Sequence, residues 1–265
     1  MADGRFDALV LAAGRGPDDP MAQAYGITHK CVLDVAGVPM ILRVLKALAD
    51  APSIDRIVIS IEDPDVVTTA PGFAELAQRT SIETVASADR ASASVAQALS
   101  SDLIDYPVLV TTADHALLTP EIVETFCAGS NEAQADVTAG LATSDTILGA
   151  YPGSARTFLK FADGCYSGCN LFTFNTEAAM KVITFWQGVE RNRKKPWRLI
   201  GAFGIWPLVL YLAGAAGLKR AFELGSKRLG LVAKPVVMPM AEAAIDVDKP
   251  EDLVLVELIL AGRED

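Results

Sequence analysis

The stretch that decides the fold is residues 11–30, LAAGRGPDDPMAQAYGITHK, which directly follows the apolar run FDALV. The apolar run reads as a buried strand, and Gly14 and Gly16 flank Arg15 where that strand should end. Open α/β sheets bind ligands at the carboxyl ends of their strands, and glycines there let backbone N–H groups approach phosphate oxygens. A glycine-rich turn after a strand is also often only a turn, so the loop alone leaves both interpretations open.

Two well-known phosphate motifs do not fit this loop. A dinucleotide-binding fingerprint needs a third glycine three residues after Gly16, where this chain has Asp19. A Walker loop closes with Gly-Lys-Ser/Thr, whereas this chain reaches Lys30 only after a detour rich in Pro and Asp. If the loop holds a phosphate, it does so in another way.

Strand-like and helix-like runs alternate outward from this loop. Residues 39–50 carry apolar side chains at helical spacing, and residues 56–62, RIVISIE, are rich in β-branched residues. Thr119 before Pro120 and Glu121 is typical of a helix N-terminus. By the same criteria we expect strands at 6–13, 56–62, 81–87 and 106–114, and helices at 39–50, 73–80, 93–102 and 119–129. This alternation predicts an α/β sandwich with a mostly parallel sheet.

The pattern changes after about residue 131. The segments DVTAGLA, RTFLKF and NLFTFN look like strands, and residues 162–169, ADGCYSGC, look like a turn between the last two. This order favours a mixed sheet, or a hairpin added to the parallel core.

Composition limits the function. The chain has 265 residues, of which 51% are hydrophobic, so it can bury a sizeable core. Its net charge of −10 argues against nucleic acid as a partner, since non-specific binding needs a basic surface, but not against a nucleotide held by a few basic groups. Four scattered cysteines suit a reducing compartment, and the first residues lack the basic region of a signal peptide. We therefore expect a cytoplasmic protein.

Residues 199–218, LIGAFGIWPLVLYLAGAAGL, carry no charge and are flanked by the basic runs RNRKKPWR and KR. Their length and flanks meet the first criteria for a transmembrane helix. Four glycines and Pro207 weaken that interpretation because they are poor helix formers. The alternatives are a helical hairpin that is buried or lies in a subunit interface, and a helix pair on a membrane surface. Membrane association and a homo-oligomer both stay open.

Acidic residues stand where ligands of a sheet edge are expected. Asp114 ends the strand VLVTTAD and would face the same crevice as the glycine loop, which suits Mg²⁺ binding, although Asp also commonly caps turns where strands stop. Asp246 and Asp248 in AIDVDKPEDL share one face if the segment is extended, just before a final helix beginning at Pro250. One of the two aspartates is a candidate second metal ligand, and capping of that helix is the alternative.

Taken in order along the chain, these segments resemble the nucleotidyltransferases with a GT-A-like fold. These include the molybdenum-cofactor nucleotidyltransferases, the methylerythritol-phosphate cytidylyltransferases and the sugar-phosphate nucleotidyltransferases. Their opening pattern is LAAGxG, a lysine, then L-x-x-x-G-x-P and an apolar helix, and it is matched by residues 11–16, Lys30, Leu33, Gly37 and Pro39.

Four later segments continue the resemblance. SADRASASVAQAL is similar to the cytidylyltransferase segment R-x-x-S-V-x-x-x-L, with the Arg-to-Ser spacing one residue longer, and TTADHALLT resembles the segment of the metal aspartate. YSGCNLFTF resembles the Gly/Asn strand that contacts the second substrate, and IDVDKPEDL resembles the closing D-x-P-E-D-L. The resemblance covers one domain over 1–265 except for residues 185–235, where we expect a helical insertion.

The resemblance implies a Rossmann-like three-layer sandwich that moves an NMP group from an NTP to a phosphorylated small-molecule acceptor and releases pyrophosphate. The nucleotide, CTP or GTP, would be bound by Leu11, Ala12, Ala13, Gly14, Gly16, Ser87, Arg90 and Ser94. Arg15, Lys30 and Asp114 would be catalytic, with Mg²⁺ held by Asp114 and Asp248. Asn170 would contact the acceptor, and Lys160, Arg156 or the basic run 191–195 are candidates for gripping its phosphate.

The chain departs from the family inside the glycine loop. An Arg-Met pair usually follows the second glycine, but residues 17–21 read PDDPM, so Arg15 is the nearest substitute for the transition-state arginine. Two other classes stay open. A GT-A glycosyltransferase would be expected to carry Asp-x-Asp where residues 113–116 read ADHA, and the altered loop also fits a non-catalytic nucleotide-binding protein associated with a membrane.

Overall fold

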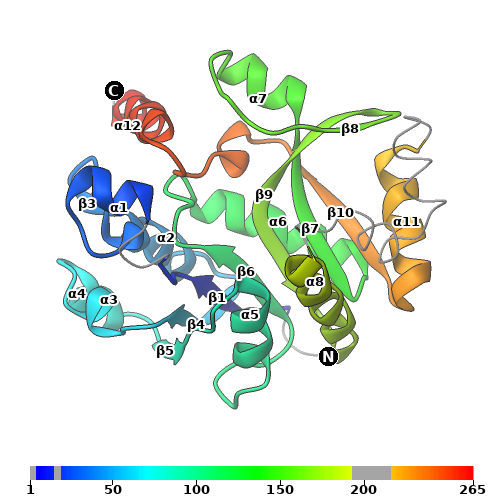
Figure 1. Ribbon diagram of the computed structural model, residues 1–265, viewed down its shortest axis with the longest axis horizontal. Helices are drawn as coiled ribbons and strands as arrows, with labels where there is room; N and C mark the ends of the chain where they lie inside the picture. Colours follow the sequence, from blue (N-terminus) through cyan, green and yellow to red (C-terminus); the bar gives the residue numbers. More distant parts are fainter. Residues whose placement is uncertain (1–3, 15–18, 193–215, 265) are drawn as a thin grey trace.

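The computed structural model describes residues 4–14, 19–192 and 216–264, and its centre is a mixed eight-stranded sheet (Figure 1). The strand order is β10-β7-β9-β6-β1-β4-β5, and β8 is added through β9. The strands are β1 Phe6–Leu11, β4 Ile54–Ile61, β5 Ile82–Ala86, β6 Val108–Thr112, β7 Val137–Thr143, β8 Leu159–Phe161, β9 Gly164–Phe174 and β10 Ala233–Met238, with a separate hairpin of β2 Asp34–Val35 and β3 Val38–Pro39. Neighbouring strands are parallel except around β9, which runs antiparallel to β6, β7 and β8.

Helices cover both faces of this sheet. The α-helices are α1 Pro20–Tyr25, α2 Met40–Ala49, α3 Asp65–Thr68, α4 Phe73–Ala77, α5 Ala91–Leu99, α6 Pro120–Ala133, α7 Ser144–Ala150, α8 Met180–Asn192, α11 Leu218–Leu229 and α12 Pro250–Glu264, with 3-10 turns η2 Lys30–Val32, η3 Glu177–Ala179 and η4 Ala241–Ala244. One apolar core joins the sheet to α2, α6 and η4, and a second joins the other face to α5 and α8. The expected three-layer α/β sandwich is therefore confirmed.

The sequence pattern explains which side chains enter each core. In β4, Ile57, Ile59 and Ile61 point to the core with α2, whereas Val58 belongs to the core with α5, as the two-residue repeat of a strand requires. α6 begins where its cap signal predicts, because the Thr119 hydroxyl accepts the N–H of Ile122 at 3.2 Å. These local rules fix the strand ends from which the site is built.

The turn expected at residues 162–169 is wrong in extent. The chain turns at residues 162–163, and Gly164 already begins β9 at a φ of 151°. Residues that suggested a turn instead pair with two neighbouring strands: Gly168 lies opposite Leu141 of β7, and Gly164 and Cys165 lie opposite Phe161 and Lys160 of β8. Long-range pairing thus overrides the local turn preference of these residues.

Several predicted features lie outside the described residues. They are Arg15, Gly16, the basic run from residue 193 on, and residues 199–215 of the long apolar stretch. Within the part of the chain that the structure describes, none of the helices combines the length and apolar character needed to cross a bilayer. Membrane contact through 199–218, a homo-oligomer and the insertion at 185–235 remain predictions, although residues 233–235 of that range begin β10.

Candidate active site

Four neighbouring parallel strands end at one edge of the sheet, and polar groups follow each of them. In the order β6, β1, β4 and β5 these groups are Asp114, Gly14, Glu62 and Ser87. The carboxyl edge of a parallel sheet is where open α/β folds bind ligands. This row of groups therefore marks the candidate active site. The glycine loop lies in it between the carboxylates of Asp114 and Glu62, and Ser87 lies beyond Glu62.

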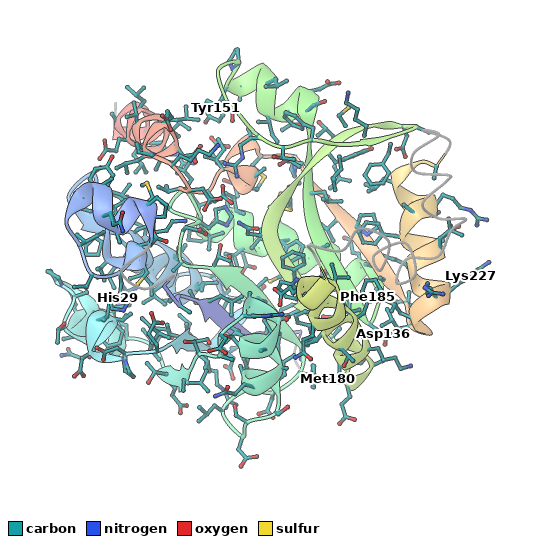
Figure 2. All side chains as sticks on the ribbon, viewed as in Figure 1. His29, Asp136, Tyr151, Met180, Phe185 and Lys227 are labelled. Atoms are coloured by element: carbon teal, nitrogen blue, oxygen red, sulfur yellow. The ribbon has the colours of Figure 1, made fainter. Side chains whose placement is uncertain are left out.

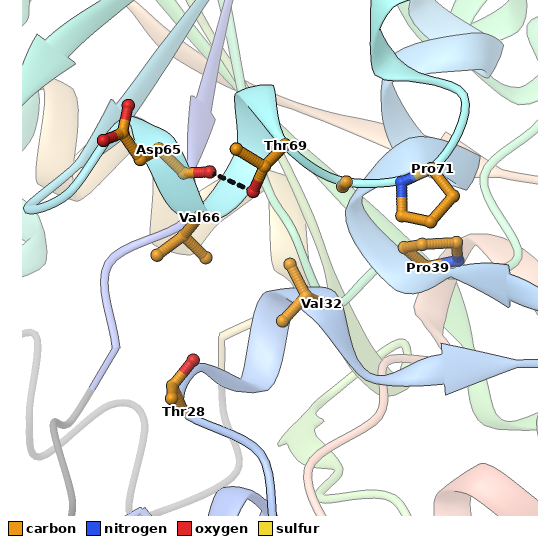
Figure 3. A pocket seen from close by; sticks show the side chains of 8 residues that line it. Thr28, Val32, Pro39, Asp65, Val66, Thr69 and Pro71 are labelled. Atoms are coloured by element: carbon orange, nitrogen blue, oxygen red, sulfur yellow. Dashed lines mark hydrogen bonds between the residues drawn. The ribbon is translucent and has the colours of Figure 1, made fainter.

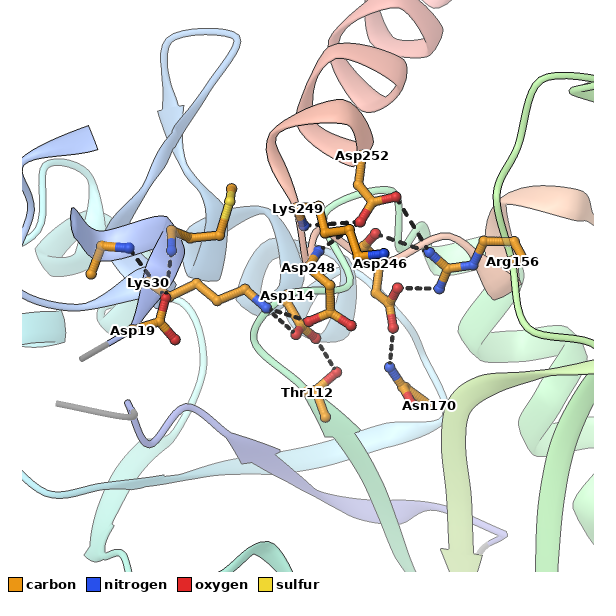
Figure 4. A network of polar contacts seen from close by, with 12 residues as sticks. Asp19, Lys30, Thr112, Asp114, Arg156, Asn170, Asp246, Asp248, Lys249 and Asp252 are labelled. Carbon is orange, nitrogen blue, oxygen red and sulfur yellow. Dashed lines mark hydrogen bonds and ion pairs between the residues drawn. The ribbon is translucent and has the colours of Figure 1, made fainter. Parts of the chain in front are cut away.

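Lys30 joins two acids that are far apart in the sequence (Figure 4). Its ammonium donates to Asp114 Oδ2 at 2.8 Å and to Asp248 Oδ1 at 2.7 Å. The Thr112 hydroxyl donates to the other oxygen of Asp114, Oδ1, at 2.5 Å, which fixes the carboxylate after β6. Three of the residues predicted to share the catalytic centre are thus brought together: Lys30, Asp114 and Asp248.

The charge of Lys30 is stabilised by its two partners. Burial alone would lower the pKa of the ammonium, but the Asp114 and Asp248 carboxylates outweigh burial and leave the pKa above its usual value. The side chain of Lys30 is only 16% exposed. A fixed positive charge therefore lies at the carboxyl edge of the sheet, next to the segment that carries the glycine loop.

A second acid–base network adjoins the first (Figure 4). Asp246 accepts from Arg156 through Oδ1 and from Asn170 Nδ2 through Oδ2, the latter at 2.7 Å. Burial raises the pKa of Asp246, the Arg156 guanidinium opposes this, and the charges of Asp114 and Asp248 add to the rise. The predicted acceptor residue Asn170 therefore reaches the acidic cluster through Asp246.

The segment carrying Asp248 is tied to the end of β6. The N–H of Val247 donates to the carbonyl of Asp114 at 3.0 Å. The ring Nε2 of His115 lies 3.3 Å from the carbonyl of Glu242 in η4, and burial lowers the pKa of His115 to about 4. A neutral imidazole with its proton on Nε2 can donate to that carbonyl. These contacts hold the two acid-bearing segments in register.

Glu62 connects three segments on the other side of Lys30. Its carboxylate accepts the N–H of Gly14 at 3.0 Å and lies 3.4 Å from the hydroxyl of Ser87. It also lies 3.3 Å from Nε2 of His29, the residue before Lys30. Because Glu62 occupies the Gly14 amide, a phosphate that binds this amide must displace the carboxylate.

The remaining predicted residues occupy different surroundings. Leu11 ends β1 and the buried Ala12 follows it. The N–H of Ala12 donates to the carbonyl of Ser60 at 3.0 Å, and Ala13 is exposed. Ser94 is buried in α5, and its hydroxyl accepts the N–H of Ala88 at 2.9 Å, so it braces the turn after Ser87. Two basic candidates are exposed: Arg90 at the start of α5 and Lys160 in β8.

The acidic pair fits a hard divalent cation. The Lys30 ammonium lies between the Asp114 and Asp248 carboxylates, so these two acids already share one cationic partner. No group of three or more His, Cys, Asp or Glu among the described residues is arranged for a metal. Mg²⁺ is usually bound through one or two carboxylates together with substrate phosphates, so two aspartates are a sufficient protein contribution.

One pocket of the described structure lies apart from this chemistry. It has a volume of about 470 Å³ and is lined by Thr28, Val32, Asp65 and Pro71, among others (Figure 3). None of Lys30, Asp114 and Asp248 lines it. Figure 2 shows His29 on the same side of the molecule as α3 and α4, and Tyr151, which donates to Glu242 at 2.6 Å, near α12. The Lys30–Asp114–Asp248 centre is therefore not part of this pocket.

Sequence reasoning missed Glu62 and did not foresee that Arg156 pairs with Asp246. Glu62 directly follows the strand RIVISI, so the signal that singled out Asp114, an acid at a strand end, was also available for Glu62. Arg156 lies in a loop without a motif, and only the fold brings it to Asp246.

Comparison with protein families places the chain in the class of the nucleotidyltransferases. The family model of the MobA-like NTP transferase domain matches residues 8–223, and the chain therefore belongs to this family. A search of curated proteins gives no match.

Solved structures agree with this fold. A hypothetical transferase from Thermus thermophilus is 26% identical, with a TM-score of 0.76 over 94% of this chain and 99% of that chain. The 4-diphosphocytidyl-2C-methyl-D-erythritol synthase of Anaerococcus prevotii is 14% identical, with a TM-score of 0.57 over 98% and 100% of the two chains. A CMP:2-keto-3-deoxy-manno-octonic acid synthetase complexed with CTP is 13% identical, with a TM-score of 0.56 over 98% and 99%. At these two lower identities the likeness is one of fold.

Proposed function

We propose that this nucleotidyltransferase moves an NMP group from CTP or GTP to a phosphorylated small-molecule acceptor. An oxygen of the acceptor phosphate forms a bond to the α-phosphorus, the bond from that phosphorus to the bridging oxygen of the β-phosphate breaks, and its electron pair leaves with pyrophosphate. The observation that carries the proposal is the Lys30 ammonium held between the Asp114 and Asp248 carboxylates beside the glycine loop.

The attacking phosphate is already anionic at neutral pH, so the reaction needs no strong general base. Positioning and charge neutralisation are then the main catalytic contributions. Of the loop amides from Ala12 to Gly16, that of Ala12 is already bonded to the Ser60 carbonyl, so the amides from Ala13 to Gly16 would face the triphosphate. Lys30 and Arg15 would offset charge on its phosphates. Asp114 and Asp248 accept two of the three N–H groups of the Lys30 ammonium, so a phosphate can be reached without loss of either contact, whereas the Gly14 amide requires release of Glu62.

Asp114 and Asp248 would hold Mg²⁺ in the reacting enzyme. When bound, Mg²⁺ supplies charge neutralisation at the phosphates. Asp114 is kept in place for this by Thr112 and by the backbone contact with Val247. Replacement of Asp114 or Asp248 by Ala should therefore weaken metal binding while the protein stays folded.

The remaining roles concern the choice of substrates. Ser87, Arg90 and Ser94 would lie towards the base, and their segment favours CTP. The names of two similar structures, a diphosphocytidyl synthase and a CMP synthetase, agree with that choice. Asn170 and Lys160 would contact the acceptor, with Lys160 as the exposed cation on its phosphate.

A pyrophosphate-release assay tests the proposal. Each of four NTPs is incubated with Mg²⁺ and a panel of phosphorylated acceptors. Pyrophosphate release that depends on one NTP and one acceptor phosphate is the expected result. Nucleotide binding without turnover would instead identify a non-catalytic relative, and transfer of a sugar from a nucleotide sugar would identify a glycosyltransferase.

A further inference from the structure

Asp246 is fully engaged beside the acidic centre. Arg156 donates to its Oδ1 and Asn170 to its Oδ2, so both carboxylate oxygens already have partners (Figure 4). The side chains of Arg156 and Asp246 are only 13% and 15% exposed. A largely buried carboxylate with both oxygens paired, two residues before Asp248, is better suited to fixing the backbone of this segment than to binding a ligand.

Arg156 touches the chain on both sides of Asp248. Its Nη1 donates to the carbonyl of Asp246 at 3.3 Å and lies 3.8 Å from Asp252 Oδ1. The other oxygen of Asp252 accepts the N–H groups of Asp248 and Lys249 at 3.0 and 2.9 Å. The Arg156 guanidinium therefore links Asp246, two residues before Asp248, with Asp252, whose carboxylate accepts the backbone N–H of Asp248.

Asn170 reaches Asp246 from an unusual backbone conformation. Its φ is 49°, in the left-handed region that non-glycine residues seldom adopt, and it lies where the register between β7 and β9 shifts. Conformations of this kind persist where the surrounding structure fixes them and are frequent at functional sites. The strain at Asn170 and the pairing of Arg156 are independent observations that point to the same carboxylate.

We propose that Arg156, together with Asp246 and Asn170, is a positioning residue that sets the direction of the Asp248 carboxylate. The side chain of Asp248 is 53% exposed, so packing does little to hold it. Residues that orient a metal ligand from behind typically change metal affinity when they are replaced. The inference rests on the proposed function, in which Asp248 is one of the metal ligands.

The test is Mn²⁺ binding to the full-length protein, measured by electron paramagnetic resonance both without nucleotide and with CTP or GTP, because substrate phosphates usually supply the other ligands. Arg156→Lys keeps the charge but loses the planar fork that reaches two acids, and should weaken binding about 10- to 100-fold. Asn170→Gly keeps access to the left-handed conformation, removes the amide, and should also weaken binding. Asp248→Ala should abolish the site.

A matched control is Arg56→Lys. Arg56 Nε pairs with the buried Asp7 at 3.2 Å. Both residues lie near the amino ends of their strands, β1 and β4, whereas the candidate site lies at the carboxyl ends, so this variant alters a comparable ion pair far from the site. It should leave Mn²⁺ binding unchanged. Circular dichroism of each variant establishes that it is folded.

Three results would overturn the inference. Wild-type Mn²⁺ affinity in folded Arg156→Lys and Asn170→Gly, with binding lost in Asp248→Ala, would reject the positioning role and leave the proposed function intact. Equal weakening in Arg56→Lys would show a general effect on stability. Equal Mn²⁺ binding by Asp248→Ala and the wild type in the presence of CTP and of GTP would remove the metal site and with it both proposals.

Discussion

At the scale of single residues, one ammonium group between two carboxylates organises the site. Lys30 neutralises part of the repulsion between Asp114 and Asp248, two acids that would otherwise lie close together with like charge. The same ammonium is the group that we propose to act on the phosphates. In our proposal Asp114 and Asp248 would hold Mg²⁺, whose charge would also neutralise the two acids.

Asn170 gives a test of backbone strain. Ala in its left-handed conformation costs roughly 1 to 2 kcal/mol, and the amide contact with Asp246 is lost as well. Asn170→Ala should therefore lower the free energy of unfolding more than Asn170→Gly, which loses the amide but not the conformation. Urea unfolding of the two variants measures this difference. A smaller loss in Asn170→Ala would contradict the role of strain.

Single residues of the site were predictable only where they stand in a motif. Lys30, Asp114 and Asp248 were identified from a pattern, but their contacts join residues 84 and 218 positions apart. Contacts between residues so far apart in the sequence depend on the order of the strands in the sheet, and no local sequence pattern encodes that order. The pairing of Arg156 with Asp246 was unpredictable for the same reason, because Arg156 lies in an irregular loop.

At the scale of helices and strands, close packing of α6 on β10 depends on one small residue. A Cβ added at Gly129 would lie 2.7 Å from Cγ1 of Val236. By contrast, a Cβ added at Gly188 in α8 would have no neighbour within 4 Å among the residues that the structure describes. The two glycines occupy helices on opposite faces of the sheet, and only the first is required by its surroundings.

The same substitution should therefore have opposite effects at the two positions. Gly129→Ala gains helix propensity but overpacks the contact with Val236, and should lower the free energy of unfolding by about 1 to 3 kcal/mol. Gly188→Ala should raise the free energy of unfolding by up to ~1 kcal/mol, because only the propensity gain remains. Chemical denaturation of both variants measures the sign. Stabilisation by Gly129→Ala would contradict the packing argument.

Local patterns predicted most elements but not all their limits. Helix α6 and strand β4 follow from a cap signal and a β-branched run. The length of β9 was underestimated, because the Gly and Cys residues in its first half favour a turn when pairing with the neighbouring strands is not considered. The capping and periodicity rules succeed because they are local, and they fail where the partner strand decides.

At the scale of the whole molecule, the last helix closes the site from the C-terminus. α12 packs Leu253 and Val256 into a third core with Met21, Leu33 and Met40, residues from the opening segments of the chain (Figure 1). Asp248 immediately precedes this helix, so the packing of α12 and the placement of Asp248 are coupled. The parallel core was predictable from alternating strands and helices, whereas the insertion of antiparallel β9 between β6 and β7 was not.

Leu253 and Leu258 test this closure within one helix. Leu253 is 5% exposed and Leu258 is 67% exposed. Leu253→Ala leaves a cavity in the third core and should lower the free energy of unfolding by roughly 2 to 4 kcal/mol. Leu258→Ala should change it by less than about 0.5 kcal/mol. Equal effects in thermal or chemical unfolding would show that α12 does not pack as described.

The central claim, that Lys30 and Asp114 carry out nucleotidyl transfer, is tested most directly by pyrophosphate release in Lys30→Ala and Asp114→Ala. The assay uses the NTP, acceptor and Mg²⁺ that support turnover by the wild type, and circular dichroism confirms that both variants are folded. The account predicts loss of turnover in each variant with the fold retained, because positioning and charge at the phosphates are removed. Near-normal turnover in either variant would contradict it.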